Sequence, residues 1–170
     1  MIDHLPDHLD LLAAAGAGRV LHGRIALARL ERVLPALVSR DGELQVSMEL
    51  GRDPDGVHYL AGTISGSVQL QCQRCLEDME LPLDVKFRLG LVRDQAAAQQ
   101  LSDRYEPLLV TAEAACIADI ISDEVLLALP IVALHSDRAE CGELLKEYQP
   151  SESPQRENPF AVLAELKQKH

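Results

Sequence analysis

Hydrophobic and polar residues alternate along the middle of the chain, on both sides of a pair of cysteines. From Ile64 to Cys72 every second residue is apolar or glycine, and from Met79 to Leu91 the same alternation resumes. Successive side chains of a strand point to opposite faces of a sheet, so this period of two predicts two half-buried strands. The short segment between them predicts an antiparallel hairpin that carries Cys72 and Cys75 at its turn.

The segment before this hairpin repeats the pattern. Every second residue between residues 44 and 50 is apolar, and the intervening residues are Gln, Ser and Glu. The Asp-Pro-Asp-Gly sequence at residues 53–56 is a clear turn signal, and residues 57–63 lead back into the hairpin. Residues 43–92 are therefore expected to form an antiparallel meander of three or four strands.

Shorter segments with helical or strand patterns flank the meander. Residues 117–129 carry the broad apolar face of a helix that Pro130 ends, and residues 105–110, which include Pro107, suit an edge strand. Short helices, then strands, then helices predict an α+β fold with the meander as its core. The remaining expected elements are short helices over residues 6–15, 27–37 and 95–101 and a strand over residues 20–28.

The last part of the chain differs in composition. Residues 149–157 consist mainly of Pro, Ser, Gln and Glu, which is typical of a linker. In the following segment, Asn158 suits a helix N-cap and Pro159 suits the first helical position. We therefore expect residues 1–148 to form one α+β domain and residues 158–170 a tethered amphipathic helix. This helix would dock on the domain or bind a partner, and its candidate partner-binding residues are Asn158, Pro159, Phe160 and Leu163.

The charge balance narrows the classes of partner. The 170 residues carry a net charge of −11, which opposes unspecific binding to phosphate backbones and favours basic protein partners. Residues 19–40, however, contain five Arg and one Glu, which allows a local RNA contact. Scattered surface arginine is more often an ordinary solvated face than a binding site. The candidate RNA-contact residues are Arg19, Arg24, Arg29 and Arg32.

No motif of a familiar enzyme class is present. The sequence contains no Gly-rich phosphate loop, no Gly-x-Ser-x-Gly and no His-Glu-x-x-His, and its carboxylates form no recognisable acid–base pair. We therefore expect neither catalytic residues nor a small-molecule substrate. The N-terminus lacks a basic region followed by an apolar run, and no apolar segment reaches the roughly 18 residues that span a membrane. A cytoplasmic protein without membrane contact is expected.

The cysteines are the most distinctive chemical feature. Two residues between Cys72 and Cys75 allow both sulfurs to face one tetrahedral ion, and His135 and Cys141 are the available further ligands. Such a Cys3His set suits zinc. Two other interpretations stay open, a reduced structural thiol pair and a redox pair, although redox pairs usually lie at the N-terminus of a helix. Cys116 lies beside a predicted helix and is expected in the core.

Three segments, in their order along the chain, resemble one known family. They are Leu70–Cys75, Asp123–Val132 followed by His135 and Cys141, and Asn158–Lys167. Together they resemble the bacterial YceD family, over most of the chain from about residue 43 onward. The resemblance implies a protein without enzymatic activity that supports accumulation of large-subunit ribosomal RNA. Relatives in other branches carry extra Cys pairs in the region near His135 and Cys141, which implies an ancestral metal site.

The resemblance and the residues together suggest two functions. The first is a ribosome biogenesis factor that binds a basic large-subunit ribosomal protein or a pre-large-subunit particle. The alternative is a direct RNA-binding module that uses the arginines of residues 19–40 and the Cys72/Cys75 turn. A low aromatic content of 3% disfavours a stacking platform for single-stranded RNA. A thiol redox enzyme is a third and more distant interpretation.

Overall fold

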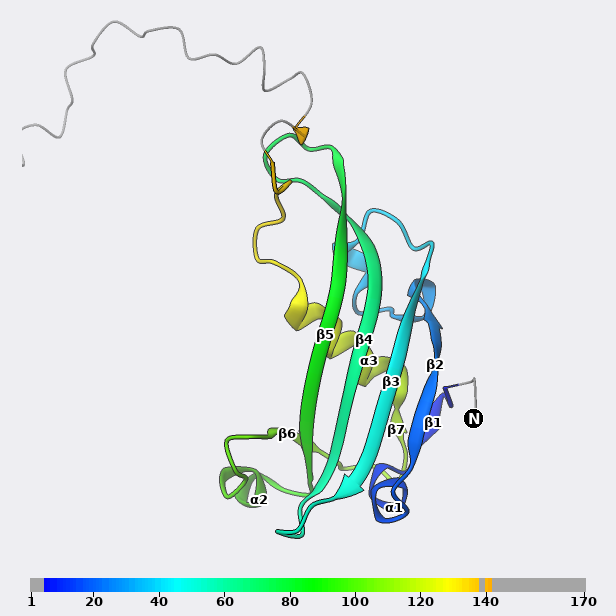
Figure 1. Cartoon of the computed structure of the whole chain (residues 1–170), viewed down its shortest axis with the longest axis vertical. Coiled ribbons are helices and arrows are strands. Elements are labelled where there is room, and N and C mark those ends of the chain that lie inside the picture. Colours follow the sequence, from blue (N-terminus) through cyan, green and yellow to red (C-terminus); the bar gives the residue numbers. More distant parts are fainter. Residues whose placement is uncertain (1–4, 138–139, 142–170) are drawn as a thin grey trace, which may run out of the picture.

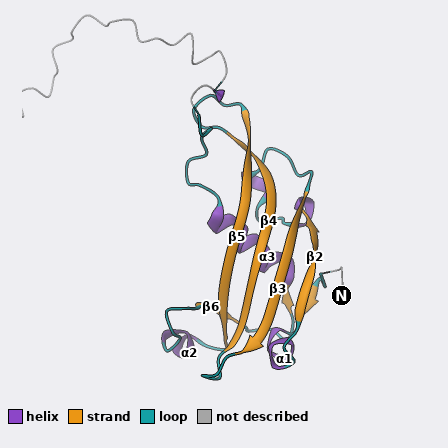
Figure 2. Cartoon of the chain, in the orientation of Figure 1, coloured by secondary structure: helices purple, strands orange, loops and turns teal. Residues whose placement is uncertain are grey.

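One long sheet dominates the computed structural model, which describes residues 5–137 and 140–141. Helix α3 (Ile117–Ala128) crosses one face of this sheet (Figure 1), and the shorter helices α1 (Leu11–Gly16) and α2 (Gln95–Gln99) both lie at one end of it (Figure 2). The strand order is β2-β3-β4-β5-β6, and β1 and β7 form a separate two-stranded sheet. The strands are β1 (His8–Leu9), β2 (Val20–Ala26), β3 (Glu43–Arg52), β4 (His58–Gln71), β5 (Asp78–Val92), β6 (Glu106–Leu109) and β7 (Ala115–Cys116).

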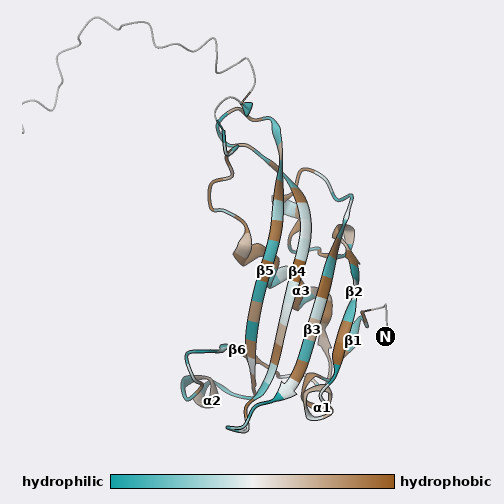
Figure 3. Ribbon diagram, in the orientation of Figure 1, coloured by the Kyte–Doolittle hydropathy of each residue, from teal (hydrophilic) through white to brown (hydrophobic). Residues whose placement is uncertain are grey.

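The predicted α+β fold with an antiparallel meander is confirmed. Strands β3, β4 and β5 pair antiparallel in sequence order, and β2 pairs antiparallel with β3 along its whole length. Figure 3 shows the hydrophobic and hydrophilic residues alternating along these strands. The turn at residues 53–56 connects β3 to β4, where Asp53 accepts a hydrogen bond from the Val57 N–H at 2.8 Å.

The core lies between the sheet and α3. Apolar residues of one face of β2–β5 are buried there against the apolar face of α3, whose Ile117, Ile121 and Val125 are at most 1% exposed. The other face of the sheet carries mainly small or charged side chains and has no helix over it among the described residues (Figure 1). Burial of one face only is the usual reason for a period of two in an antiparallel sheet.

The N-terminal helix is shorter than expected. Helix α1 spans Leu11–Gly16 and begins after Asp10, whose carboxylate accepts the Ala13 N–H at 2.9 Å. The preceding residues form β1 instead, which pairs with β7. The residues before Asp10 form a strand and not a helix because their backbone groups bond to the segment around β7; the Asp7 carbonyl, for example, accepts the Ile117 N–H.

The helix expected over residues 27–37 is wrong. Two 3₁₀ turns, η1 (Leu27–Arg29) and η2 (Leu34–Ala36), replace it. Pro35 disfavours helical backbone at the residue before it and has no N–H to donate. Leu27, Leu30 and Val33 are all buried, so the spacing predicted burial correctly even though the backbone is not a helix.

The segment after β5 forms the predicted helix and edge strand, but the alternation pattern did not predict the direction of that strand. A short helix α2 spans Gln95–Gln99, and β6 lies at the sheet edge as expected. β6 runs parallel to β5, so the sheet is mixed. Within the described ranges, no helix has both the length and the apolar content that crossing a membrane requires.

Candidate metal centre

The hairpin tip between β4 and β5 holds the first two candidate ligands. Cys72 N–H donates to the Glu77 carbonyl at 2.9 Å, and Leu76 N–H donates to the Cys72 carbonyl at 2.8 Å. Leu76 has a φ of +63°, in the left-handed region, which lets the chain reverse within this short turn. The turn keeps Cys72 and Cys75 on the same side of the hairpin, and both are buried.

The segment after α3 brings the other two candidates to the tip. Pro130 follows the end of the helix, and the chain then runs back along the sheet toward the hairpin (Figure 1). A backbone hydrogen bond of 2.8 Å from the Gln73 N–H to the Ala133 carbonyl fastens this segment to the turn. His135 and Cys141 thereby come close to the cysteine pair.

The four candidate ligands form one cluster. The sulfurs of Cys72, Cys75 and Cys141 and a ring nitrogen of His135 all lie within 4.8 Å of one another. His135 Nδ1 is 3.4 Å from Cys75 Sγ and 3.6 Å from Cys141 Sγ. A tetrahedral zinc with Zn–S of about 2.3 Å and Zn–N of about 2.0–2.1 Å requires a sulfur–nitrogen separation of about 3.5 Å. The two sulfur–nitrogen separations therefore fit zinc.

The protonation of the thiols also suits a cation. Burial alone would raise the pKa of Cys72. Hydrogen bonds from the backbone N–H groups of Cys75, His135 and Arg74 outweigh this effect and lower the pKa to about 5. Burial and the neighbouring sulfurs of Cys75 and Cys72 raise the pKa of Cys141 to about 11. One thiolate is thus stable in the cluster by itself, whereas Cys141 ionises readily only if a positive charge lies among the sulfurs.

Arg74, between the two cysteines of the turn, is a contributor that the sequence analysis missed. Its Nη1 donates to Cys141 Sγ at 3.7 Å. Three thiolates around a divalent ion leave one excess negative charge, which an adjacent guanidinium offsets. An arginine inside a Cys-x-x-Cys turn is a signal that could have been used, since its side chain starts next to both sulfurs.

The four arginines proposed for RNA contact do not all share one environment. Arg24 lies 3.8 Å from Glu43, with both side chains more than half exposed. Arg29 is paired with Asp7, and Arg32 is paired with Asp123 of α3. Three of the four are therefore next to carboxylates that reduce their attraction for phosphate.

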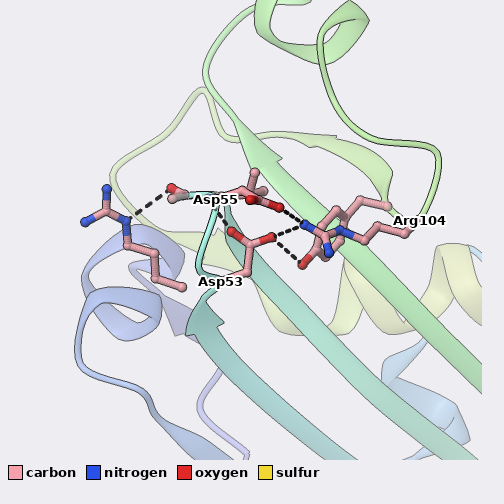
Figure 4. Close-up of polar contacts among 7 residues, drawn as sticks. Asp53, Asp55 and Arg104 are labelled. Atoms are coloured by element: carbon pink, nitrogen blue, oxygen red, sulfur yellow. Dashed lines mark hydrogen bonds and ion pairs between the residues drawn. The ribbon is translucent and has the colours of Figure 1, made fainter.

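A second polar cluster, at the opposite end of the sheet, was not expected from the sequence. Arg104 Nη2 lies 2.7 Å from Asp53 and 2.5 Å from Asp55, and Figure 4 shows both carboxylates turned toward it. The Tyr105 hydroxyl donates to Asp53 at 2.9 Å, and the Tyr105 ring stacks on Tyr59 with centroids 6.3 Å apart. This cluster joins the β3–β4 turn to the segment before β6, so its evident role is structural.

The remaining predicted sites fall elsewhere. The linker at 149–157, the helix at 158–170 and the residues Asn158, Pro159, Phe160 and Leu163 lie outside the described residues. Cys116, at the junction of β7 and α3, is only partly buried, so the expectation that it lies in the core is wrong, and it lies outside the ligand cluster.

Comparisons with known proteins agree on one family. The sequence model described as "Large ribosomal RNA subunit accumulation protein YceD" matches residues 60–167. A protein of Haemophilus influenzae with the same name is 32% identical over 151 residues, which cover 86% of this chain and 87% of that protein. No solved structure is significantly similar to the chain. The matched region includes the hairpin, α3 and all four candidate ligands.

Proposed function

Because this chain belongs to the YceD family, we propose that it supports accumulation of large-subunit ribosomal RNA by binding a component of the large ribosomal subunit. The match over residues 60–167 is the observation that carries this proposal. The partner is a basic large-subunit ribosomal protein or an assembly intermediate that contains one. The action is binding, not catalysis.

The charge of the chain supports a protein partner over RNA. A net charge of −11 attracts basic proteins and repels phosphate backbones. The carboxylates beside Arg24, Arg29 and Arg32 weaken these side chains as phosphate ligands. Ribosomal proteins that have not yet bound RNA are strongly basic, so an acidic binding protein suits them before assembly.

Two measurements test this function. Deletion of the gene should lower the amount of large-subunit ribosomal RNA relative to small-subunit ribosomal RNA, and the intact gene should restore it. Capture of the tagged full-length protein, with and without ribonuclease, should retain a basic large-subunit protein in both cases. An unchanged RNA ratio after deletion contradicts the proposal.

The capture experiment also separates the RNA-binding alternative. If all bound material is lost with ribonuclease, the partner is RNA, and binding should weaken steeply as salt is raised. The triple variant Arg24→Ala, Arg29→Ala, Arg32→Ala should then lose the RNA. Under the proposed function the same variant keeps its basic protein partner.

We also propose that Cys72, Cys75, His135 and Cys141 hold a structural zinc ion. The Cys3His donor set, the separations near 3.5 Å and the adjacent Arg74 support this assignment. Zinc here would join the loop after α3 to the hairpin tip. Protein purified without a histidine tag should contain about one zinc per chain by elemental analysis.

A matched pair of variants tests the zinc ligands. Cys75→Ser should lose the zinc, and Cys116→Ser, which changes a thiol outside the cluster, should retain it. Absence of stoichiometric metal from the unchanged protein would instead favour the reduced structural thiols. If metal is absent and the protein catalyses disulfide exchange that Cys72→Ser abolishes, the redox interpretation is correct.

A further inference from the structure

An apolar groove lies beside the candidate metal centre. It has a volume of about 650 Å³ and is bounded by residues 35–38, the end of β4, the end of α3 and the segment after α3. Its lining is mainly hydrophobic and includes Leu37, Val38, Leu70, Leu126, Leu129 and Ile131. Leu70 belongs to the core, and Leu37, Leu126 and Leu129 pack against it, whereas Val38 and Ile131 remain exposed.

The groove exposes large hydrophobic side chains to a degree that needs explanation. Ile131 is 98% exposed and Val38 is 46% exposed, and Val132 beside them is 52% exposed. Backbone hydrogen bonds hold the chain on both sides of the groove, since the Val38 N–H donates to the Gln69 carbonyl at 2.9 Å and the Ala133 carbonyl accepts from the Gln73 N–H at 2.8 Å. Apolar side chains held together around one concave surface mark a contact site for another apolar segment.

The position at which the described chain ends points to the occupant. Cys141, the last described residue, belongs to the same cluster as His135. His135 in turn follows Ala133 by two residues, and Ala133 lines the groove. A further 29 residues follow it in the sequence. The linker alone, extended at roughly 3.3 Å per residue, reaches about 30 Å, so the C-terminal segment can return to the groove.

The sequence of the C-terminal segment has the complementary chemistry. In helical geometry Phe160, Leu163, Leu166 and Val162 fall on one side, which gives an apolar face about two turns long. A tether places such a segment at an effective concentration on the order of millimolar, so a groove of modest affinity is enough to hold it. A separate protein would need higher affinity to occupy the same surface.

We propose that residues 158–167 of this chain bind in the groove as an amphipathic helix, with Phe160 and Leu163 against its apolar lining. This contact would cover Val38 and Ile131 and attach the end of the chain to the domain beside the metal centre. It is independent of the proposed function, because it requires no other molecule.

Photo-crosslinking of the full-length protein tests the contact. Benzoylphenylalanine in place of Phe160 keeps a large apolar ring at that position and reacts with whatever lies against it. Irradiation should link it to residues 35–38 or 126–133 of the same chain, with a yield that does not change with protein concentration. Peptide mass spectrometry identifies the linked residues.

Two exposed residues provide a variant and its matched control. Ile131→Glu places a carboxylate in the apolar contact and should reduce the crosslink about tenfold or more. Leu127→Glu changes a residue of α3 that is 73% exposed but does not line the groove, and it should leave the yield unchanged. Both positions are at the surface, and circular dichroism would verify that both variants fold.

Three outcomes would overturn the proposal. Crosslinks that join two chains and increase with concentration would assign the groove to a second copy. Crosslinks to residues outside the groove, or a yield that Ile131→Glu does not change, would separate the segment from this surface. Crosslinks in cell lysate only to another protein would assign the segment to a partner. None of these results affects the capture of a ribosomal protein, so failure of this proposal is distinguishable from failure of the proposed function.

Discussion

The sulfur of Cys75 lies 3.4 Å from Nδ1 of His135, although 60 positions separate the two residues in the sequence. The contact joins the tip of the longest hairpin to the segment that follows α3. The nearby backbone bond from Gln73 to Ala133 holds the same two segments at 2.8 Å. A zinc ion at this position would therefore stabilise a long-range connection and not only a local turn.

Removal of zinc should loosen this connection. Treatment with a chelator, or the variant Cys75→Ser, should lower Tm by about 5 °C or more, because a structural metal contributes its binding free energy to folding. Hydrogen exchange should become faster at the Gln73 amide, because its N–H donates to the Ala133 carbonyl on the other segment. Calorimetry and exchange mass spectrometry measure the two effects.

The control for this prediction is Cys116→Ser, which removes a thiol outside the cluster and should leave the response to chelator intact. An unchanged Tm on chelation of protein that contains zinc would show that the metal is not structural.

The sequence predicted those parts of the fold that follow from local periodicity. β3, β4 and β5 each bury one face over most of their length, so a period of two is visible there, and α3 has an equally clear helical face. The helix expected over residues 27–37 failed because the same spacing also buries Leu27, Leu30 and Val33 on a path with two 3₁₀ turns, the second of which contains Pro35. Spacing reports which side chains are buried and leaves the backbone path open.

Contacts between distant segments could be predicted only in part. The set Cys72, Cys75, His135 and Cys141 was accessible because thiols and imidazole are few and zinc needs four ligands. The pairing of Arg32 with Asp123 and of Arg104 with Asp53 was not accessible, since charged residues are numerous and any two of opposite sign can pair. The parallel direction of β6 likewise depends on the path of the chain through α2 and the following residues.

Gly62 of β4 should tolerate no side chain. A Cβ at this position would lie 2.5 Å from the Phe87 ring on the neighbouring strand and 2.7 Å from the Ser47 carbonyl on the other. Gly62→Ala should therefore destabilise the fold by about 1–3 kcal/mol, the usual cost of overpacking. Urea denaturation followed by circular dichroism measures the change.

Gly16 provides the matched control for this prediction. A Cβ there meets no atom within 4 Å, so Gly16→Ala should be neutral or slightly stabilising, since alanine loses less backbone entropy in a helix. Equal effects of the two substitutions would contradict the packing that the structure gives Phe87.

Glu124 of α3 should make folding less stable as pH rises. The residue is only 7% exposed, and burial raises the pKa of its carboxyl, with further contributions from Glu106 and Asp123. A folded-state pKa above the unfolded value favours folding at low pH, and this advantage is lost as pH increases beyond about 4.5. Glu124→Gln should therefore raise Tm by about 2–4 °C at pH 7.

The pH dependence is the decisive part of this prediction. The difference in Tm between Glu124→Gln and the unchanged protein should shrink toward pH 4, where the glutamate is also neutral. Asp119→Asn, on the same helix, is the control for a general loss of negative charge. A difference that stays constant from pH 4 to pH 7 would show that the carboxyl of Glu124 is not the cause.

Asp53 should have the opposite dependence on pH. Burial alone would raise the pKa of its carboxyl, but hydrogen bonds from the Val57 N–H and the Tyr105 hydroxyl, together with the charge of Arg104, lower it. The carboxylate therefore stabilises the fold above about pH 3.8, and this contribution is lost as pH falls through the folded-state pKa.

Asp53→Asn places an amide N–H₂ where the tyrosine hydroxyl and Arg104 both donate, so it should lower Tm by several degrees at pH 7. Asp55→Asn should have a much smaller effect, because the Asp55 side chain is 71% exposed and its ion pair with Arg104, shown in Figure 4, lies at the surface. Thermal melts of both variants from pH 3 to pH 7 provide the measurement, and equal losses for the two would refute the central position of Asp53 in this cluster.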